Sequence, residues 1–283
     1  MKIKFLGTSA GWPLPRLGCK CEICTSTDPK DRRTRTQILV NESVLLDAGP
    51  DTYHHLLSLT SHPETFAPLE GKLREGSRDS SPSAQNDNIA GVCKIQAILV
   101  SHAHLDHIEG FWDLTHIYNG YKPIPVYIVQ SVLNDVRKFI GIHGQNLKIH
   151  VVKPHQSFAI GHAKVEYFPV IHGRTPAFGI KVKDGPILAY IPDFNKILPS
   201  SQKVIRDCHL LIIDGSSLDK IGQTKGHISI NDGIQIAKNL RAKSTYFVHI
   251  GHKTGTHQFL EDYLHQNAGQ SFHIAYDGLE IDI

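Results

Sequence analysis

Short apolar runs that end in turn residues are the dominant pattern along this chain. Six of them have the length and the Ile, Val and Leu content of buried strands: Ile3–Leu6, Ser43–Leu46, Ile95–Val100, Ile187–Ile191, Leu210–Ile213 and Thr245–Val248. A polar side chain follows the end of nearly every run, which is typical of an active site on the rim of a sheet. The pattern therefore predicts a sheet protein with its functional residues at one edge.

Fewer segments show the apolar spacing of a helix than show the pattern of a strand. Ser229 and Asp232 form a capping-box pattern, and the apolar residues that follow keep helical intervals through Leu240. Two further amphipathic helices are predicted at Val132–Phe139 and Phe259–Leu264. Strands in succession with interspersed helices, rather than strict alternation, favour an α+β fold built as a four-layered αββα sandwich.

Residues 59–92 interrupt this pattern. The stretch from Glu75 to Asn88 is rich in Ser, Asn and Asp and nearly devoid of large apolar side chains. Such a segment buries too little surface to offset the entropy lost on ordering, so we predict a mobile polar insertion. A surface loop without a role is favoured over a lid. The whole chain, residues 1–283, is predicted to form a single domain around this insertion.

The composition describes an ordinary globular protein, with 40% hydrophobic and 20% charged residues. A formal net charge of +3 is too small to indicate nucleic acid or an acidic membrane as a partner. The first residues contain no apolar run long enough for a signal peptide or a membrane span. The five cysteines include one tight cluster, which argues against a secreted disulfide framework. We expect a reduced, cytoplasmic protein.

The 19 histidines are the unusual feature of the composition. Four metal-ligand side chains stand directly after the predicted strand Ile95–Val100: His102, His104, Asp106 and His107. Alternate side chains of an extended segment point the same way, so the first three converge. Three imidazoles and a carboxylate suit Zn²⁺ or Mn²⁺. A chance cluster on a solvated loop is disfavoured, because the group follows an apolar strand so closely.

A second metal motif lies near the N-terminus, where Cys19, Cys21 and Cys24 are separated by polar residues. Three thiolates at this spacing suit a structural Zn²⁺, which requires a fourth ligand. Three reduced core cysteines are the alternative, and the polar Lys20 and Glu22 between them speak against it. Cys93 and Cys208 lie in apolar surroundings and are predicted to be core residues.

The pattern H-x-H-x-D-H after a strand resembles the signature of the metallo-β-lactamase superfamily, whose fold is a four-layered αββα sandwich with metal ions at one edge. The resemblance implies a third histidine, a bridging aspartate and a last histidine at later strand ends, and these are His172, Asp193 and His249. It assigns His102, His104 and His172 to one ion. Asp106, His107 and His249 would hold the other ion, with Asp193 between the two.

Further motifs resemble the PhnP group within this superfamily, a group of phosphoribosyl cyclic phosphodiesterases. They are the Gly-Thr turn at residues 7–8, the cysteine cluster, the stretch Val248–His252 and the stretch Asp277–Ile281. The resemblance implies that His252 completes the structural zinc site and ties the N-terminal loop to the last strands. The chain departs from the group in Pro192 before Asp193, in the long insertion, and in lacking a Cys-Ser-His near Asp214. These departures leave the substrate open.

The resemblance also assigns a general acid. His227 stands just before the capped helix, where the family's catalytic histidine lies. A phosphodiester needs such an acid because an alkoxide leaves poorly unless it is protonated. Arg174 follows His172 closely and is predicted to bind a substrate phosphate. Asp47 and Asp214, at strand ends, are candidates for orienting the imidazoles.

The leading hypothesis is a phosphodiesterase that hydrolyses a small cyclic phosphate ester, either phosphoribosyl 1,2-cyclic phosphate or a cyclic nucleotide. It would use two catalytic divalent ions (Mn or Zn) that activate water, carboxylates Asp106 and Asp193, general acid His227 and one structural zinc. The alternatives are a PqqB-like accessory protein that binds metal without hydrolysis, a tRNA 3′-processing endonuclease and a lactonase. Nucleic acid is not expected, because the long insertion is more acidic than basic. No membrane partner is expected either, and a homodimer is left open.

Overall fold

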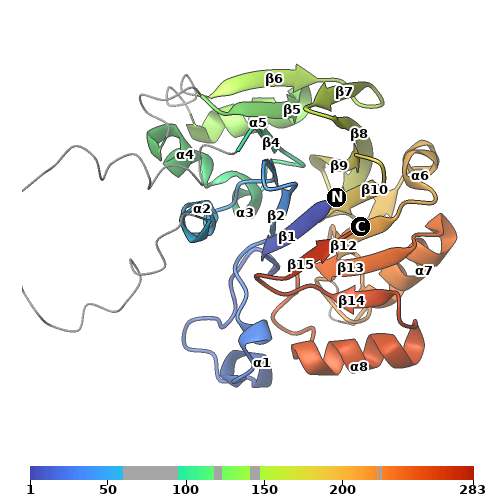
Figure 1. Ribbon diagram of the computed structural model, residues 1–283. Coiled ribbons are helices and arrows are strands. Elements are labelled where there is room, and N and C mark those ends of the chain that lie inside the picture. Colours follow the sequence, from blue (N-terminus) through green and yellow to red (C-terminus); the bar gives the residue numbers. More distant parts are fainter. Residues whose placement is uncertain (60–94, 118–122, 141–146, 222, 224) are drawn as a thin grey trace, which may run out of the picture.

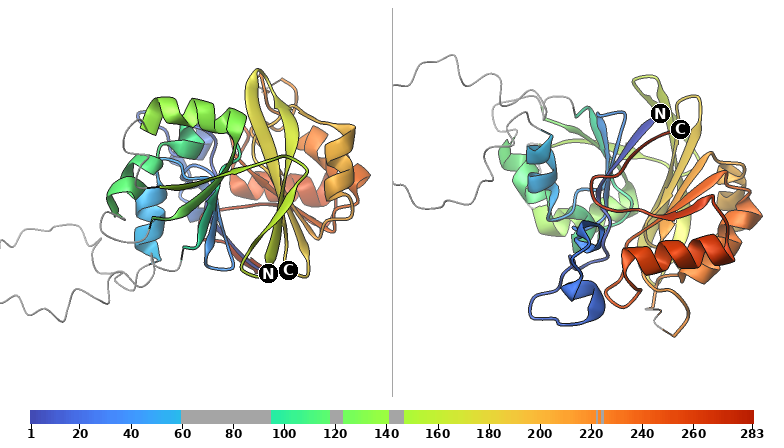
Figure 2. Two further views of the ribbon diagram at one scale, coloured as in Figure 1. Left: turned by 90° about the horizontal axis from the view of Figure 1, so that it is seen from above. Right: turned by 60° about the horizontal axis from the view of Figure 1, so that its bottom comes forward.

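Two mixed β-sheets pack face to face, and helices cover the outer side of each sheet (Figures 1 and 2). The computed structural model describes residues 1–59, 95–117, 123–140, 147–221, 223 and 225–283. Blue and green elements form most of one half of the sandwich, and yellow to red elements form the other (Figure 2). The predicted α+β, four-layered αββα sandwich is confirmed.

The first sheet has the strand order β15-β1-β2-β3-β4-β5-β6 among the described residues. Its strands are β1 (Lys2–Gly7), β2 (Gln37–Val40), β3 (Val44–Leu46), β4 (Ala97–Leu99), β5 (Pro125–Val129), β6 (Lys148–Val152) and β15 (Glu280–Asp282). The pairs from β3 to β6 are parallel, and the others are antiparallel. The helices on this side are α2 (Thr52–Ser58), α3 (Leu105–Ile108), α4 (Phe111–Ile117) and α5 (Gln130–Ile140).

The second sheet has the order β11-β8-β9-β10-β12-β13-β14, and β7 (Ser157–Ile160) pairs with β8. Its strands are β8 (Ala163–His172), β9 (Thr175–Lys183), β10 (Ile187–Ile191), β11 (Lys196–Ile197), β12 (Leu210–Asp214), β13 (Ser244–Val248) and β14 (Phe272–Ile274). Its helices are α6 (Pro199–Ile205), α7 (Ile230–Leu240) and α8 (His257–Asn267). The short α1 (Glu22–Thr25) and a 3₁₀ turn (Pro29–Asp31) lie in the loop between β1 and β2.

Apolar side chains fill the spaces between the layers of the sandwich. Between the sheets, residues such as Leu45 and Ile98 pack in one cluster with Tyr167 and Leu188. A second cluster lies between the outer face of the second sheet and its helices, and Phe247 is one of its buried residues. Burial on both faces explains why several strands of this sheet are continuous apolar runs rather than alternating patterns.

The predicted elements agree with the structure to within three residues at each end. Ser229 caps α7, and its hydroxyl accepts a hydrogen bond from the backbone N–H of Asp232. The hairpin of β8 and β9 was not predicted, because its residues include Pro169, Pro176 and Gly179. Cys208 is fully buried, as expected. The predicted insertion at residues 59–92, apart from Leu59, and Cys93 lie outside the described residues.

A buried polar network holds the loop between β1 and β2 against the C-terminal segment. The guanidinium of Arg33 is 1% exposed and donates to the hydroxyl of Thr8 and to the carbonyl of Ala275. Asp277 accepts hydrogen bonds from Thr8 Oγ1 at 2.7 Å and from the backbone N–H of Thr34 at 2.6 Å. The loop that carries the three cysteines is therefore tied to the last strands through buried bonds.

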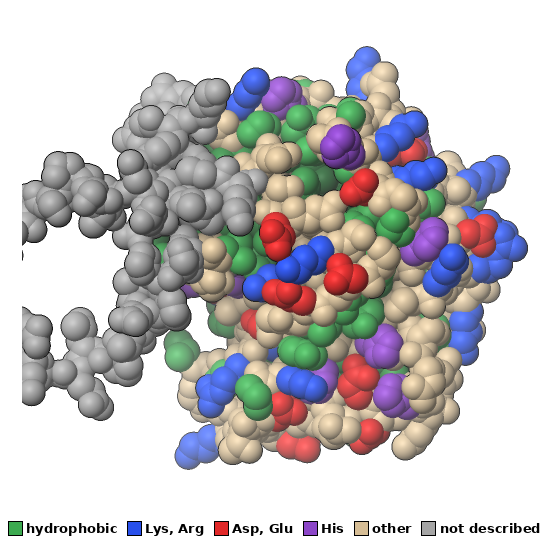
Figure 3. All heavy atoms as spheres, viewed as in Figure 1, with side chains coloured by type: hydrophobic (Ala, Val, Ile, Leu, Met, Phe, Trp, Pro, Cys, Tyr) green, Lys and Arg blue, Asp and Glu red, His purple; other side chains and the backbone are tan. Residues whose placement is uncertain are grey.

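One face of the molecule carries side chains of both charges. On the face seen in Figure 3, basic and acidic side chains are interspersed, in keeping with the formal net charge of +3. Within the described ranges, no helix combines the length and the apolar character needed to cross a lipid bilayer. The cytoplasmic location stays a prediction.

Gly179 provides a test of packing in the second sheet. It lies opposite Phe168 across β8 and β9, and a Cβ added to Gly179 would lie 2.2 Å from the Phe168 ring. Phe168 is fully buried and cannot move into solvent. We expect Gly179→Ala to lower the free energy of unfolding by about 1–3 kcal/mol, measured by urea denaturation. In a Phe168→Leu background the same change should have a smaller effect; equal effects would contradict this contact.

Candidate metal centre

Side chains from both sheets meet where their strands end. The loop and helix after β4 carry His102, His104, Asp106 and His107, while His172 ends β8 and His249 follows β13. Asp193 follows β10, and Asp214 ends β12. The strand ends that were predicted to carry the functional residues therefore meet at one edge of the molecule, and both sheets contribute to that edge.

The first group of ligand-type side chains contains three imidazoles and one carboxylate. They are His102, His104, His172 and Asp193, whose ligand atoms lie within 4.8 Å of one another. His172 Nε2 lies 3.1 Å from His104 Nδ1, and His102 Nε2 lies 3.4 Å from Asp193 Oδ2. Nitrogen atoms this close, facing a carboxylate oxygen, resemble one shell of donors around a cation.

The second group contains two carboxylates and two imidazoles, namely Asp106, His107, Asp193 and His249. His249 Nε2 lies 3.3 Å from Asp106 Oδ2 and 3.2 Å from Asp193 Oδ1. Asp193 therefore belongs to both groups. Its Oδ2 faces the first group and its Oδ1 faces the second, which is the arrangement of a carboxylate that bridges two cations.

The buried atoms of these groups fit divalent metal ions. The structure shows no hydrogen-bond partner, among the residues it describes, for His102 Nε2, His107 Nε2 or Asp193 Oδ1. Buried polar atoms without a partner are rare in native proteins, and a bound cation would satisfy all three of these atoms. A mixed set of nitrogen and oxygen donors suits Zn²⁺ or Mn²⁺.

The protein environment keeps most of the imidazoles neutral, which is the form that binds metal. Burial lowers the pKa of His102 and His172, and it lowers the pKa of His104 to about 4. His107 differs, because nearby carboxylates, Asp106 first among them, outweigh burial and raise its pKa well above the ordinary value. The second group therefore carries more negative charge than the first, and this charge favours the binding of a cation.

Asp47 holds the second group in place from behind. Its carboxylate is fully buried, and Oδ2 accepts hydrogen bonds at 2.8 Å from the hydroxyls of Ser101 and Tyr190. His107 Nδ1 lies 2.8 Å from the same oxygen, so Nε2 is the nitrogen directed at the ligand group. Such partners fix the ring and raise its basicity. Ser101 Oγ also lies 2.9 Å from His102 Nδ1, which extends the support to the first group.

Backbone packing sets the position of the other ligands. A Cβ on Gly49 would lie 2.1 Å from the carbonyl oxygen of Asp106, so only glycine lets the loop after β3 approach the metal-ligand helix α3 this closely. The carbonyl of Gly226 lies 2.7 Å from His172 Nδ1. On the other side of the first group, Thr175 Oγ1 lies 3.1 Å from His104 Nε2. In each imidazole of the first group, the nitrogen that does not face the other ligand atoms thus contacts an oxygen of a neighbouring residue.

His227 lies beside the ligand groups and is held by Asp214. Its Nδ1 lies 2.9 Å from Asp214 Oδ2, and its ring stacks on that of His249 with centroids 5.1 Å apart. Burial opposes protonation of His227, but the hydrogen bond and charge of Asp214 raise its pKa to about 9. Asp214 therefore favours the protonated imidazole and occupies its Nδ1.

The three clustered cysteines meet His252. Its Nε2 lies 3.1 Å from Cys19 Sγ and 3.2 Å from Cys21 Sγ, and Cys24 belongs to the same group of possible ligands. Burial and the charges of Arg16 and Lys253 lower the pKa of His252, which keeps it neutral as a ligand must be. Three thiols and one imidazole are a donor set typical of structural zinc.

The structure brings together nearly all the residues predicted for the site. The seven metal-ligand candidates form two adjoining groups, and the four residues of the zinc motif form a third. Arg174 lies exposed in the tight turn between β8 and β9, and its substrate-binding role stays a prediction. Asp214 lies 2.9 Å from His227 Nδ1 and 3.9 Å from Nδ1 of the ligand imidazole of His249. Sequence reasoning missed Ser101, Thr175 and Tyr190, because single hydroxyl groups in strands and turns carry no distinctive spacing.

Comparisons with known proteins agree with this architecture. A family model described as a β-lactamase superfamily domain matches residues 42–250. A structure described as a new diphosphatase from the PhnP family superimposes with a TM-score of 0.77 at 26% identity, covering 100% of this chain and 97% of that one. Zn(2+)-bound PqqB from Methylobacterium extorquens superimposes with a TM-score of 0.73 at 24% identity, with both chains fully covered (100%).

Two curated relatives add to the picture. The coenzyme PQQ synthesis protein B of Methylorubrum extorquens is 24% identical over 328 residues, covering 100% of both proteins. An octanoyltransferase of Porphyromonas gingivalis is 26% identical over 292 residues, which cover 99% of this chain and 51% of that protein. The chain therefore spans about half the length of the octanoyltransferase.

Asp47→Asn tests the support of the second group. Asparagine tolerates the left-handed backbone at this position, where φ is 64°, so the change removes the carboxylate without straining the loop. We expect affinity for Zn²⁺ or Mn²⁺ to fall about 10–100-fold, measured by competition with a chelator. Tyr190→Phe, which removes a single donor to Asp47, is the matched control and should have a smaller effect. Unchanged affinity in Asp47→Asn would show that His107 needs no such partner.

Cys21→Ser tests the zinc motif. Loss of one thiolate should remove one zinc ion per chain, measured by elemental analysis, and should lower the melting temperature by more than about 5 °C. Cys208→Ala, at a core cysteine outside the motif, should keep the full zinc content. A Cys21→Ser protein with unchanged zinc content and stability would rule out a structural zinc here.

Proposed function

The chain belongs to the metallo-β-lactamase superfamily, and from this premise we propose that it is a phosphodiesterase with two divalent metal ions. Its substrate would be a small cyclic phosphate ester, such as phosphoribosyl 1,2-cyclic phosphate or a cyclic nucleotide. One observation carries the proposal: Asp193 directs its two oxygens at two separate sets of imidazoles.

The ligand groups define which residues would hold the ions. His102, His104 and His172 would hold one, Asp106, His107 and His249 the other, and Asp193 would contact both. Two ions held in this way supply a water molecule of lowered pKa and neutralise charge on a phosphate oxygen. The Cys19, Cys21, Cys24 and His252 group would hold a structural Zn²⁺.

His227 would act as the general acid. Asp214 occupies Nδ1, so the proton on Nε2 is the one available to the leaving oxygen of the ester. The pKa of about 9 keeps this proton in place at neutral pH. An acid is needed because the leaving group of a sugar phosphate is an alkoxide, which departs slowly without protonation. Asp214 serves here by positioning the ring and stabilising its charge.

The similar proteins support phosphate chemistry without naming the substrate. The PhnP-family structure is described as a diphosphatase, which shares phosphorus as its reaction centre with the proposed activity. The full-length similarity to PqqB supports, as a second candidate, a metal-binding accessory protein. The dyad of His227 and Asp214 beside two ligand groups favours catalysis, since a binding protein needs no proton donor there. Because the octanoyltransferase is covered over only half its length, its name supports no acyl-transfer proposal.

We expect a small phosphate ester, and no nucleic acid, as the partner of this site. The formal net charge of only +3 gives little support to a tRNA-processing endonuclease, which needs a basic surface for the phosphate backbone. A lactonase would use the same ligand groups on a carbonyl. A substrate panel of cyclic phosphates, bis-p-nitrophenyl phosphate and lactones, with Mn²⁺ or Zn²⁺ added, separates these functions. Turnover of lactones alone, or of nothing, would contradict the proposal, and Asp193→Ala serves as the inactive control.

His227→Gln gives a sharper test of the mechanism. Removal of the acid should lower kcat about 10²–10⁴-fold for a sugar cyclic phosphate. The loss should be much smaller for bis-p-nitrophenyl phosphate, because nitrophenolate is a stable leaving group that needs no proton. Metal content, measured in parallel, should equal that of the unaltered protein. Equal losses on both substrates would exclude His227 as the proton donor.

A further inference from the structure

A further group of metal-ligand side chains lies where helix α8 runs beside strand β14 (Figure 1). It contains Glu261, His265 and His273, whose ligand atoms all lie within 4.8 Å of one another. None of the three belongs to the ligand groups of the metal centre or to the cysteine motif. Two imidazoles and one carboxylate are a donor set that binds zinc in proteins.

Regular secondary structure brings these three side chains to one place. Glu261 and His265 are four residues apart on α8, so they lie on the same face of the helix. His273 is the middle residue of β14, the last strand of the second sheet among the described residues. Because α8 packs against this strand, the pair on the helix meets the histidine of the strand.

The carboxylate of Glu261 is held in place by the edge of the sheet. Its Oε1 accepts a hydrogen bond from the backbone N–H of Ile274 at 2.5 Å, which satisfies a donor on the outer side of the edge strand. The other oxygen, Oε2, lies 3.5 Å from His265 Nε2 and 3.8 Å from His273 Nδ1. Among the described residues, these imidazoles are its only basic neighbours within 4.0 Å. The carboxylate is therefore oriented in advance toward both rings.

The separations of these atoms differ from those of two hydrogen-bonded ion pairs. An imidazolium that donates to a carboxylate comes within about 2.7–2.9 Å of its oxygen. A tetrahedral zinc ion, with bonds of about 2.0–2.2 Å, holds its ligand atoms about 3.3–3.6 Å apart. The contact of Glu261 with His265 falls inside this second range and the contact with His273 lies close to it. The three atoms are thus spaced as ligands of a common ion.

The two histidines are ordered but accessible. His273 is in register with Tyr246 of β13, and their rings lie with centroids 4.8 Å apart. The rings of His265 and His273 are nearly perpendicular, at 89°, with centroids 6.3 Å apart. Their side chains are 41% and 30% exposed, respectively. A metal ion can therefore enter from solvent, and water can complete its coordination.

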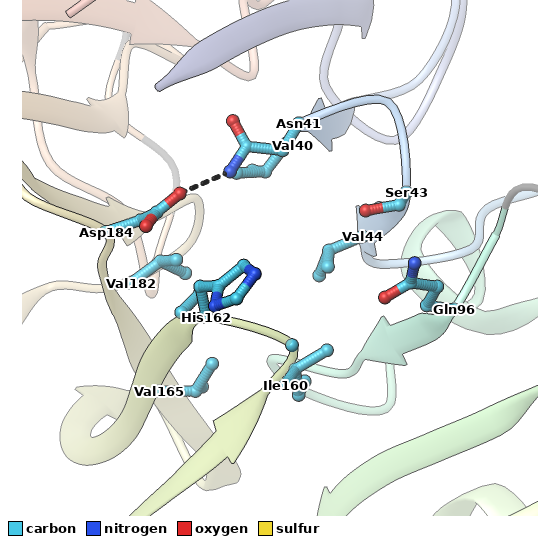
Figure 4. Close-up of a pocket in the computed structure, with 12 residues that line it drawn as sticks. Val40, Asn41, Ser43, Val44, Gln96, Ile160, His162, Val165, Val182 and Asp184 are labelled. Atoms are coloured by element: carbon cyan, nitrogen blue, oxygen red, sulfur yellow. Dashed lines mark hydrogen bonds between the residues drawn. The ribbon is translucent and has the colours of Figure 1, made fainter.

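Two cavities lined by described residues offer no comparable set of ligands outside the metal centre. The larger, of about 810 Å³, is lined by His227 and His249 and belongs to that centre. The smaller, of about 260 Å³, lies between the sheets where β8 begins (Figure 4). His162 points into it, and Asp184 at its edge accepts a hydrogen bond from Asn41. No third histidine, cysteine or carboxylate lines this smaller cavity among the described residues.

We propose that Glu261, His265 and His273 form a surface binding site for one zinc ion, with water completing its coordination. The ion would join α8 to the edge strand β14 and so stabilise the folded state of this part of the second sheet. The site shares no residue with the metal centre, and the proposal does not rest on the proposed phosphodiesterase activity.

The test titrates Zn²⁺ into the full-length, untagged protein after the metal centre and the cysteine motif have been filled with zinc, as counted by elemental analysis. Calorimetry should then show one further zinc ion per chain. His265→Ala, at an exposed side chain, and Glu261→Gln, which keeps an acceptor for the N–H of Ile274, should each weaken this binding about tenfold or more. His162→Ala removes an exposed histidine outside the group and should leave the binding unchanged.

Three results of the titration would overturn the site. They are no further ion in the unaltered protein, equal binding in all four proteins, and loss of the ion in His162→Ala. Neither calorimetry nor elemental analysis uses a phosphate ester, so failure of the phosphodiesterase proposal would leave this test intact.

Thermal unfolding gives a second readout on the same proteins. A ligand that binds only the folded state stabilises it, so zinc at about ten times its Kd should raise the Tm of the unaltered protein by about 3 °C. His162→Ala should show the same rise, and His265→Ala should show none. An equal rise in His265→Ala would assign the stabilisation to other residues and contradict the proposed site.

Discussion

The site depends on the hydrogen bonds that the buried carboxylate of Asp47 makes with its neighbours. It follows β3, receives bonds from Ser101 after β4 and from Tyr190 of β10, and contacts His107 of α3. One charged side chain thus joins both sheets behind the ligand groups. A buried anion is costly unless every lone pair is satisfied, so these partners are required together. Rigid support of this kind is what lets adjoining imidazoles and carboxylates keep a common orientation.

The loop after β13 couples the two kinds of ligand group. His249 belongs to the second His and Asp group and His252, three residues later, belongs to the cysteine group. The N-terminal loop reaches this segment through Cys19 and Cys21, and the buried Arg33 network ties the same loop to the C-terminal segment. A change in the cysteine motif would therefore disturb the wall of the cavity and the position of His249 together. Structural and reactive groups share one short segment, which makes the zinc motif part of the architecture of the site.

Charge is distributed unevenly across the site in a way that suits its proposed chemistry. The carboxylates gather around His107 and His249, while the imidazoles of the first group are kept neutral by burial. His227, outside both groups, is held protonated by Asp214. The cavity that His227 and His249 line has two further basic side chains on its wall, those of Arg16 and Lys253.

The sequence alone predicted the sandwich, its strand ends and the four ligand positions of the H-x-H-x-D-H motif, because local pattern encodes these features, whereas His172, Asp193 and His249 followed from the resemblance to a known family. An apolar run followed by H-x-H-x-D-H places its side chains through strand alternation and one helical turn, without help from distant residues. Only the tertiary structure decided which oxygen of Asp193 faces which group, that Asp214 holds His227, and that Arg16 and Lys253 line the same cavity as His227. Those contacts join residues far apart in the chain, and their geometry depends on how two sheets pack. Spacing along a sequence carries no record of that packing.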